Sequence, residues 1–235
     1  MTSPTRIAVF GANGPTGRLL TEQLLADGHP VAAATRRPVD FPISHTRLSV
    51  LDVDVHDPAA VDAVVAGSDA VLSAVGASFG KQTISVYSVG VTNIIASMRR
   101  HRVRRLAVVS SSAVAPNPHP PGGFVFNKIL QPYVERIIGK TVYDDMRRME
   151  ALVRASGLDW TIVRPSGLYD AATVSDYVLT EGHGNGRFTS RRDLAASLAH
   201  QLTDDRFVGR TVAVISTGDH PSLIKLIMTE SRKKG

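Results

Sequence analysis

The chain alternates short apolar runs with longer segments in which apolar residues recur at helical spacing. The short runs are typical of buried strands, and they lie at 7–10, 31–35, 48–53, 69–76, 105–109, 160–164 and 210–216. Helical periodicity covers 15–26, 58–66, 82–100, 124–155 with a break near 139, and 191–202. Such alternation predicts parallel strands joined by right-handed crossovers. We therefore expect a doubly wound α/β fold with a mostly parallel sheet.

A glycine-rich turn joins the first predicted strand to the first predicted helix, with Gly11, Gly14 and Gly17 at G-x-x-G-x-x-G spacing. Backbone N–H groups at a helix N-terminus approach a phosphate closely only where no Cβ intervenes. We interpret Gly11 as the turn, Gly14 as the point of close approach and Gly17 as the helix packing position. Pro15 suits the first helical turn. The turn predicts a pyrophosphate site; the alternative is an ordinary strand-to-helix connection.

Two arginines, Arg36 and Arg37, follow the second predicted strand. In a Rossmann fold an acidic residue at this strand end binds the ribose 2′-hydroxyl, whereas an arginine accommodates a 2′-phosphate. No Asp or Glu stands there. The pattern predicts NADP(H) rather than NAD(H), with Arg36 as the main contact and Arg37 as a second one. The alternative is a pair of surface arginines in a loop.

The length of 235 residues fits one Rossmann domain over 1–235 with a small C-terminal elaboration on the substrate side. Two segments near 115–145 and 166–190 are expected on that side. The first contains a proline-rich loop at 116–123, and we expect the second to be irregular over 168–186. The tail after Pro221 predicts a short apolar helix.

Composition narrows the classes of function. The chain has no cysteine, which excludes a disulfide framework and a thiolate nucleophile. The net charge of +6 comes from scattered basic residues, so we expect no nucleic-acid binding, and a basic surface favours a phosphorylated cofactor. No histidine pair has metal-ligand spacing, and no apolar run reaches the length of a membrane span. We expect a cytoplasmic protein, monomeric or homodimeric, that acts on a small molecule without a metal.

Several segments together resemble the atypical short-chain dehydrogenase/reductases, in particular the NAD(P)H-binding group that includes biliverdin-IXβ/flavin reductase and NmrA-like proteins. The matching segments are the glycine-rich loop 11–17, Thr35-Arg36, Asp52-Val53, 109–114, 156–165 and 190–195. They span nearly the whole chain. They are specific for fold and cofactor and only weakly specific for substrate.

The resemblance implies roles for individual residues. Ser112 matches the serine that polarises a substrate carbonyl in relatives, and Pro165 ends the strand beside the nicotinamide. Asp52 and Val53 would flank the adenine. The remaining cofactor-binding candidates are Gly11, Asn13, Gly14, Pro15, Thr16 and Gly17 at the pyrophosphate, Ala74, Val75 and Gly76 at the nicotinamide ribose, and Ser110 and Ser111 at the end of the fifth strand.

Relatives with full chemistry carry a Y-x-x-x-K pair, in which lysine lowers the tyrosine pKa for proton transfer. Tyr143 and Arg147 have that spacing here, but counting back from Ser156-Gly157 places Met146 at the family lysine or histidine. Arginine does not replace lysine, because it stays protonated. Tyr143 is thus a candidate acid or a packing residue, and we expect the adjacent Asp144 and Asp145 to be solvated.

The favoured function is an NADPH-dependent oxidoreductase that passes hydride to a small planar acceptor such as a flavin, a quinone or a related ring. Such acceptors take their proton from solvent and need no tyrosine-lysine pair. One alternative is a carbonyl reductase, epimerase or dehydratase that uses Ser112 and Tyr143. Another is a non-catalytic NADP(H) redox sensor of the NmrA type.

Overall fold

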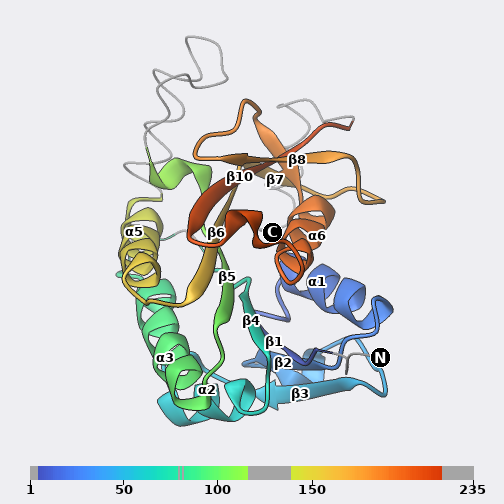
Figure 1. The fold of residues 1–235 in the computed structure, drawn as a ribbon, viewed down its shortest axis with the longest axis vertical. Helices are drawn as coiled ribbons and strands as arrows, with labels where there is room; N and C mark the ends of the chain where they lie inside the picture. The colour runs from blue at the N-terminus through green and yellow to red at the C-terminus, as the bar shows by residue number, and fades with distance from the viewer. Residues whose placement is uncertain (1–4, 79, 81, 116–138, 219–235) are drawn as a thin grey trace.

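The computed structural model describes residues 5–78, 80, 82–115 and 139–218. One sheet holds eight strands in the order β3-β2-β1-β4-β5-β6-β10-β8 (Figure 1). The parallel strands are β1 (Ile7–Phe10), β2 (Val31–Thr35), β3 (Leu48–Asp52), β4 (Ala70–Ser73), β5 (Arg105–Val109), β6 (Asp159–Pro165) and β10 (Arg210–Ser216). The strand order reverses beside β1, between β1 and β4, which creates the crevice where this fold binds dinucleotides. The expected doubly wound Rossmann fold is confirmed.

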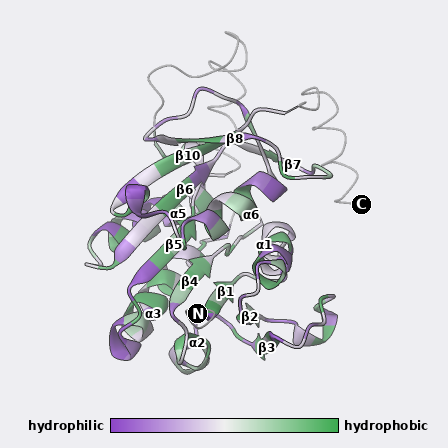
Figure 2. Ribbon diagram, turned by 45° about the vertical axis from the view of Figure 1, so that its right-hand side comes forward, coloured by the Kyte–Doolittle hydropathy of each residue, from purple (hydrophilic) through white to green (hydrophobic). Residues whose placement is uncertain are grey.

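Helices cover both faces of this sheet (Figure 1). One face carries α2 (Pro58–Val65), α3 (Val86–His101) and α5 (Lys140–Arg154), and the other carries α1 (Pro15–Ala26) and α6 (Arg191–His200). The central strands β1, β2 and β4 are buried on both sides, because each face is covered, and the helices turn polar residues outward (Figure 2). Neighbouring residues of β1 show the division: Ala8 and Phe10 pack on one side, Ile7 and Val9 on the other.

The segment 166–190 corrects the expectation of an irregular stretch. It contains three strands, β7 (Gly167–Tyr169), β8 (Tyr177–Glu181) and β9 (Phe188–Ser190). β8 pairs antiparallel with β10 and forms the sheet edge, while β7 and β9 form a separate parallel pair. β8 has only five residues, and its three apolar residues stand side by side, so it shows no clear strand alternation.

Helix limits differ modestly from those predicted. The helix expected from residue 82 begins at Val86 and ends at His101, followed by Arg102 in the left-handed region with φ of 60°. Short 3-10 turns, η1 (Pro38–Asp40), η2 (Ser112–Val114) and η5 (Asp205–Phe207), lie in connections. The proline-rich loop at 116–123, the helix expected from residue 124 to 138 and the tail after Pro221 lie outside the described residues.

Candidate dinucleotide and active site

The three glycines of the loop differ in how much space surrounds them. Gly11 has a φ of +73°, and a Cβ built on it would lie 2.6 Å from the carbonyl oxygen of Ala74 on the neighbouring strand end. A Cβ on Gly17 would lie 2.1 Å from the Gly11 carbonyl oxygen. At Gly14 the only neighbour within 4 Å would be that same oxygen, at 3.3 Å. The fold itself therefore requires Gly11 and Gly17, whereas Gly14 leaves open space outside the loop.

The N-terminus of α1 has the features of an anion-binding site. Gly14 is its N-cap and supplies no side-chain cap, and Pro15 is the first helical residue. Within the part of the chain that the structure describes, the N–H groups of Thr16 and Gly17 have no hydrogen-bond acceptor, and the first turn has no acidic residue. Unpaired N–H groups and the positive end of the helix dipole together favour a phosphate here.

Arg18 is a residue of this loop that sequence reasoning missed. Its Nε donates to the main-chain oxygen of Asn13 at 3.1 Å and to the side-chain oxygen at 2.9 Å. The Asn13 amide in turn reaches the carbonyl oxygen of Arg37 at 3.5 Å. Asn13 thus supports the shape of the loop and links it to the end of β2. The signal available in the sequence was a basic residue directly after the third glycine.

The adenosine end is predicted at the carboxyl ends of β2 and β3. Arg36 and Arg37 are exposed, and Arg37 lies 3.8 Å from Asp40 while Arg36 has no ion pair among the described residues. Asp52 is exposed at the end of β3 and Val53 is buried beside it. The Val53 N–H donates to the Thr35 carbonyl oxygen at 2.9 Å, so the two strand ends lie together.

The loop after β4 lies next to the glycine-rich turn. The Ala74 N–H donates to the Phe10 carbonyl oxygen at 2.9 Å, and the backbone passes close to Gly11. Ala74 and Val75 are half-buried and Gly76 is exposed. The Ala77 N–H donates to the Tyr87 hydroxyl at 3.0 Å, which attaches this loop to α3. The predicted residues 74–76 therefore meet the phosphate loop at one edge.

The three serines after β5 have separate partners. Ser110 is buried and its hydroxyl donates to Glu150 at 2.7 Å. The Ser111 oxygen accepts from the Ala113 N–H at 3.2 Å and caps η2. The half-buried Ser112 hydroxyl has no hydrogen bond to any described residue. Of the three, Ser112 is the one whose side chain makes no hydrogen bond with a described residue.

A buried ion pair lies beneath these serines. Arg164, next to Pro165 at the end of β6, forms two hydrogen bonds with Glu150, of 2.8 and 2.6 Å. Glu150 is 1% exposed. Burial would raise its pKa, but the hydrogen bonds from Arg164 and Ser110 hold the pKa below its ordinary value. The carboxylate therefore stays ionised and connects α5 to the ends of β5 and β6.

Tyr143 and Arg147 lie one helical turn apart on α5 but differ in burial. Tyr143 and Met146 are both buried and belong to the core between α5 and the sheet. Arg147 is exposed, donates to the Val114 carbonyl oxygen at 2.9 Å and pairs with Asp144 at 2.7 Å. Arg147 thus anchors the turn that carries Ser112. The assignment of Tyr143 as proton donor stays a prediction.

Asp145 corrects the expectation of a solvated helix position. Its side chain is fully buried and accepts from the N–H groups of Tyr87 at 2.9 Å and Ser88 at 3.3 Å. The Ser88 hydroxyl and Arg148 bind its other oxygen. Asp145 thus caps α3 from the neighbouring helix. Its two backbone donors, Tyr87 and Ser88, are 58 and 57 positions away from it in the sequence.

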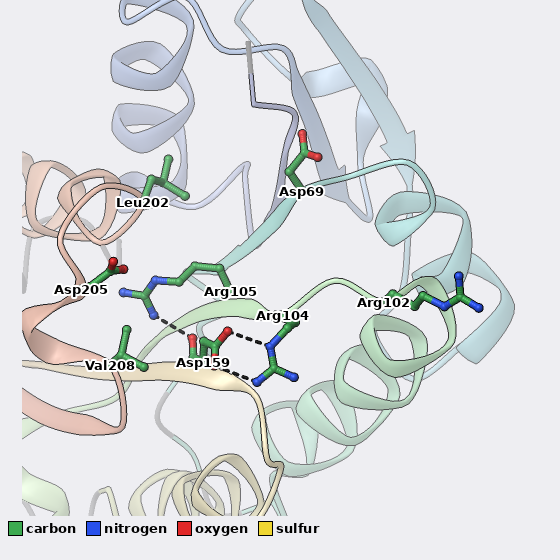
Figure 3. A pocket seen from close by; sticks show the side chains of 8 residues that line it. All are labelled: Asp69, Arg102, Arg104, Arg105, Asp159, Leu202, Asp205 and Val208. Carbon is green, nitrogen blue, oxygen red and sulfur yellow. Dashed lines mark hydrogen bonds and ion pairs between the residues drawn. The ribbon is translucent and has the colours of Figure 1, made fainter. Parts of the chain in front are cut away.

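A hollow of about 610 Å³ lies at the opposite edge of the sheet (Figure 3). Three of its charged residues stand at the starts of strands: Asp69 precedes β4, and Arg105 and Asp159 begin β5 and β6. Asp159 is engaged by two hydrogen bonds from Arg104, both of 2.9 Å. Ligands of open α/β sheets bind at the carboxyl ends of the strands, so we do not place the cofactor in this hollow.

The described residues lack two further features. They contain no cluster of three or more His, Cys, Asp or Glu side chains suited to a metal ion. None of their helices has both the length and the apolar character needed to cross a membrane.

Known proteins resemble this chain over most of its length. An uncharacterized chloroplastic protein of Arabidopsis thaliana is 27% identical over 227 residues, which cover 92% of this chain and 78% of that protein. A short-chain dehydrogenase/reductase from Veillonella parvula, solved in complex with NADP, has a TM-score of 0.76 at 20% identity, covering 94% of this chain and all of that one. ChuY, described as an anaerobillin reductase from Escherichia coli O157:H7, has a TM-score of 0.71 at 20% identity. The match covers 93% of this chain and 100% of ChuY.

The family comparison decides the class of the protein. A family model described as NAD(P)H-binding matches residues 11–205, from the first loop glycine to η5. The match confirms the expected nicotinamide dinucleotide cofactor and the resemblance to Rossmann-fold reductases of the atypical short-chain type. This chain belongs to the NAD(P)H-binding family.

Proposed function

We propose that this protein is an NADPH-dependent reductase that transfers hydride to a small planar acceptor, such as a flavin, a quinone or a related ring compound, in the cytoplasm. The glycine loop and the α1 N-terminus would hold the pyrophosphate, and Arg36 the 2′-phosphate. The bound dinucleotide supplies the hydride. Each of these groups lies at the carboxyl edge of the sheet, around the strand-order reversal.

The observation that carries the proposal is the distribution of proton donors around Ser112. The Ser112 hydroxyl is unbonded within the described chain, Tyr143 is packed in the core, and Arg147 is committed to Val114 and Asp144. Reduction of a ketone leaves an alkoxide that needs a nearby acid. Reduction of a flavin or quinone leaves a delocalised anion that water can protonate. Within the described chain, the Ser112 hydroxyl is unbonded and Lys140 is paired with Asp144 at 2.7 Å, and this arrangement suits the second reaction better.

A neighbour's description supports the assignment as a reductase. ChuY, which shares the fold, is described as an anaerobillin reductase. The comparison supports a reductase and leaves the acceptor of this chain to experiment.

The test is steady-state NADPH oxidation with a panel of flavins, quinones and ketones. We expect turnover with the ring acceptors, a clear loss in Ser112→Ala, and less than about a threefold loss in Tyr143→Phe, far below the ~10²–10⁴-fold expected for a positioned general acid. Gly14→Val serves as the control that blocks the phosphate path without filling protein space.

Two results would overturn this function. A loss of about a hundredfold in Tyr143→Phe, with NADPH affinity unchanged, would make Tyr143 the acid and favour carbonyl chemistry. Tight NADPH binding without turnover of any acceptor would favour a redox sensor.

A further inference from the structure

Three polar side chains outside the dinucleotide loop form a linear hydrogen-bonded chain. The Nδ1 atom of His56 lies 2.8 Å from the Oδ1 atom of Asp54, and its Nε2 atom lies 3.1 Å from the Oγ atom of Ser85. Asp54 and His56 belong to the loop after β3, and Ser85 is the N-cap of α3. A nucleophile within reach of a base, itself oriented by a third group, is the arrangement that activates serine in hydrolases.

Asp54 determines how the imidazole is held. It also accepts the backbone N–H of His56 at 2.9 Å, so the carboxylate and ring are fixed by one short loop. The pKa of Asp54 is lowered, first by the hydrogen bond from that N–H and then by the bond from the His56 ring. An ionised carboxylate only accepts hydrogen bonds, so it selects the tautomer with the proton on Nδ1. Nε2 is then free to accept the Ser85 proton.

The Ser85 side chain does not accept a hydrogen bond from the first turn of α3, as an N-cap serine usually does. It makes no side-chain hydrogen bond to its own helix, because Asp145 takes the N–H groups of Tyr87 and Ser88. The N–H of Val86 has no acceptor within the described chain. A free N–H on the residue after a nucleophile can stabilise a developing oxyanion, aided by the helix dipole.

The site is open to small molecules. The His56 and Asp54 side chains are 44% and 52% exposed. A groove of about 480 Å³ lies between α3 and α5, and Ser88, Val89 and Thr92 line it from α3. Ser85 itself does not line the groove, but it is the N-cap of α3, and Ser88 and Val89 follow it by three and four residues. Much of the rest of the groove is apolar, with Ala151 and Leu152 from α5.

We propose that Ser85, His56 and Asp54 form a second catalytic site that hydrolyses small carboxylic esters with an apolar acyl group. Ser85 Oγ attacks the carbonyl carbon while its proton passes to His56 Nε2. Collapse of the tetrahedral intermediate breaks the ester bond, and His56 returns the proton to the leaving alcohol. Water then attacks the acyl group on Ser85 with His56 again as base, which releases the acid and restores the serine. The step consumes only ester and water.

The experiment measures p-nitrophenyl acetate and butyrate hydrolysis by the full chain without dinucleotide. We expect Ser85→Ala and His56→Ala to lower the enzyme-dependent rate roughly a hundredfold and Asp54→Asn to lower it less. His45→Ala is the matched control, because His45 is an exposed histidine outside the three-residue chain. Its rate should equal that of the unmodified protein.

A second measurement does not depend on the variants folding. The unmodified protein is treated with a fluorophosphonate, and the modified residue is identified by peptide mass spectrometry. Modification of Ser85 is the expected result. Modification elsewhere, no modification, or Ser85→Ala and His45→Ala rates within twofold of each other would overturn the proposal. None of these outcomes bears on NADPH oxidation, so the two proposals are tested separately.

Discussion

Arg36 and Arg37 are adjacent, exposed and of equal charge, yet they have different partners. Arg37 faces Asp40 at 3.8 Å, whereas Arg36 has no ion pair among the described residues. We expect Arg36→Ala to weaken NADPH binding by roughly ten- to a hundredfold, because a charge-assisted phosphate contact is worth about 1.5–3 kcal/mol. NADH binding should be unchanged. Titration calorimetry of both dinucleotides measures the preference.

Arg37→Ala is the matched control for this prediction and should change NADPH affinity less than Arg36→Ala. Equal affinity of the unmodified protein for the two dinucleotides would contradict the assignment of the 2′-phosphate site.

At the scale of elements, α3 depends on α5 for its N-terminal cap. Asp145→Asn keeps the size of the side chain but replaces one accepting oxygen with an NH₂ group. Since two N–H groups, the Ser88 hydroxyl and Arg148 share this carboxylate, we expect a loss of about 1–3 kcal/mol in the free energy of unfolding. Urea unfolding monitored by circular dichroism measures it.

Asp144→Asn is the neighbouring control. Asp144 is partly exposed and pairs with Lys140 and Arg147 on the helix surface, where such pairs contribute roughly 0–1 kcal/mol. If the two variants lose equal stability, the buried cap is not what joins the helices.

At the scale of the whole molecule, Glu150 and Arg164 join a helix to two central strands. Glu150→Gln would leave the buried guanidinium of Arg164 without its counter-charge, and we expect a loss of about 3–5 kcal/mol in the free energy of unfolding at neutral pH. Glu181→Gln, which breaks the exposed pair with Arg210 at 3.3 Å, is the control and should cost less than about 1 kcal/mol.

The pKa of Glu150 gives this prediction a pH dependence. Its folded-state pKa lies below the ordinary value of 4.5, so its contribution is complete above that pH and is lost as the pH falls through the folded-state pKa. The stability difference between Glu150→Gln and the unmodified protein should therefore shrink below pH 4.5. A difference that is constant with pH would mean that packing, and not charge, explains the loss.

Much of the fold followed from local patterns. Apolar runs marked the seven parallel strands, because strands buried on both faces must be apolar on both sides. Gly11, Gly14 and Gly17 indicated the phosphate loop, since only glycine tolerates the required φ and the close backbone approach. The strand β8 was not predicted because it is short and half-exposed at the sheet edge. Its pairing with β10, and not its own sequence pattern, makes it a strand.

The sequence by itself determined the Rossmann fold class and the positions of the glycine-rich turn and of the arginine after β2, because each depends on residues close together in the chain. Only the tertiary structure decided which of the three serines makes no hydrogen bond with a described residue, that Asp145 caps another helix, and that His56 meets Ser85 across 29 positions. These outcomes depend on burial and on contacts between distant segments. The spacing of residues within one helix cannot specify such contacts, because the packing of helices and strands determines which distant residue becomes the partner.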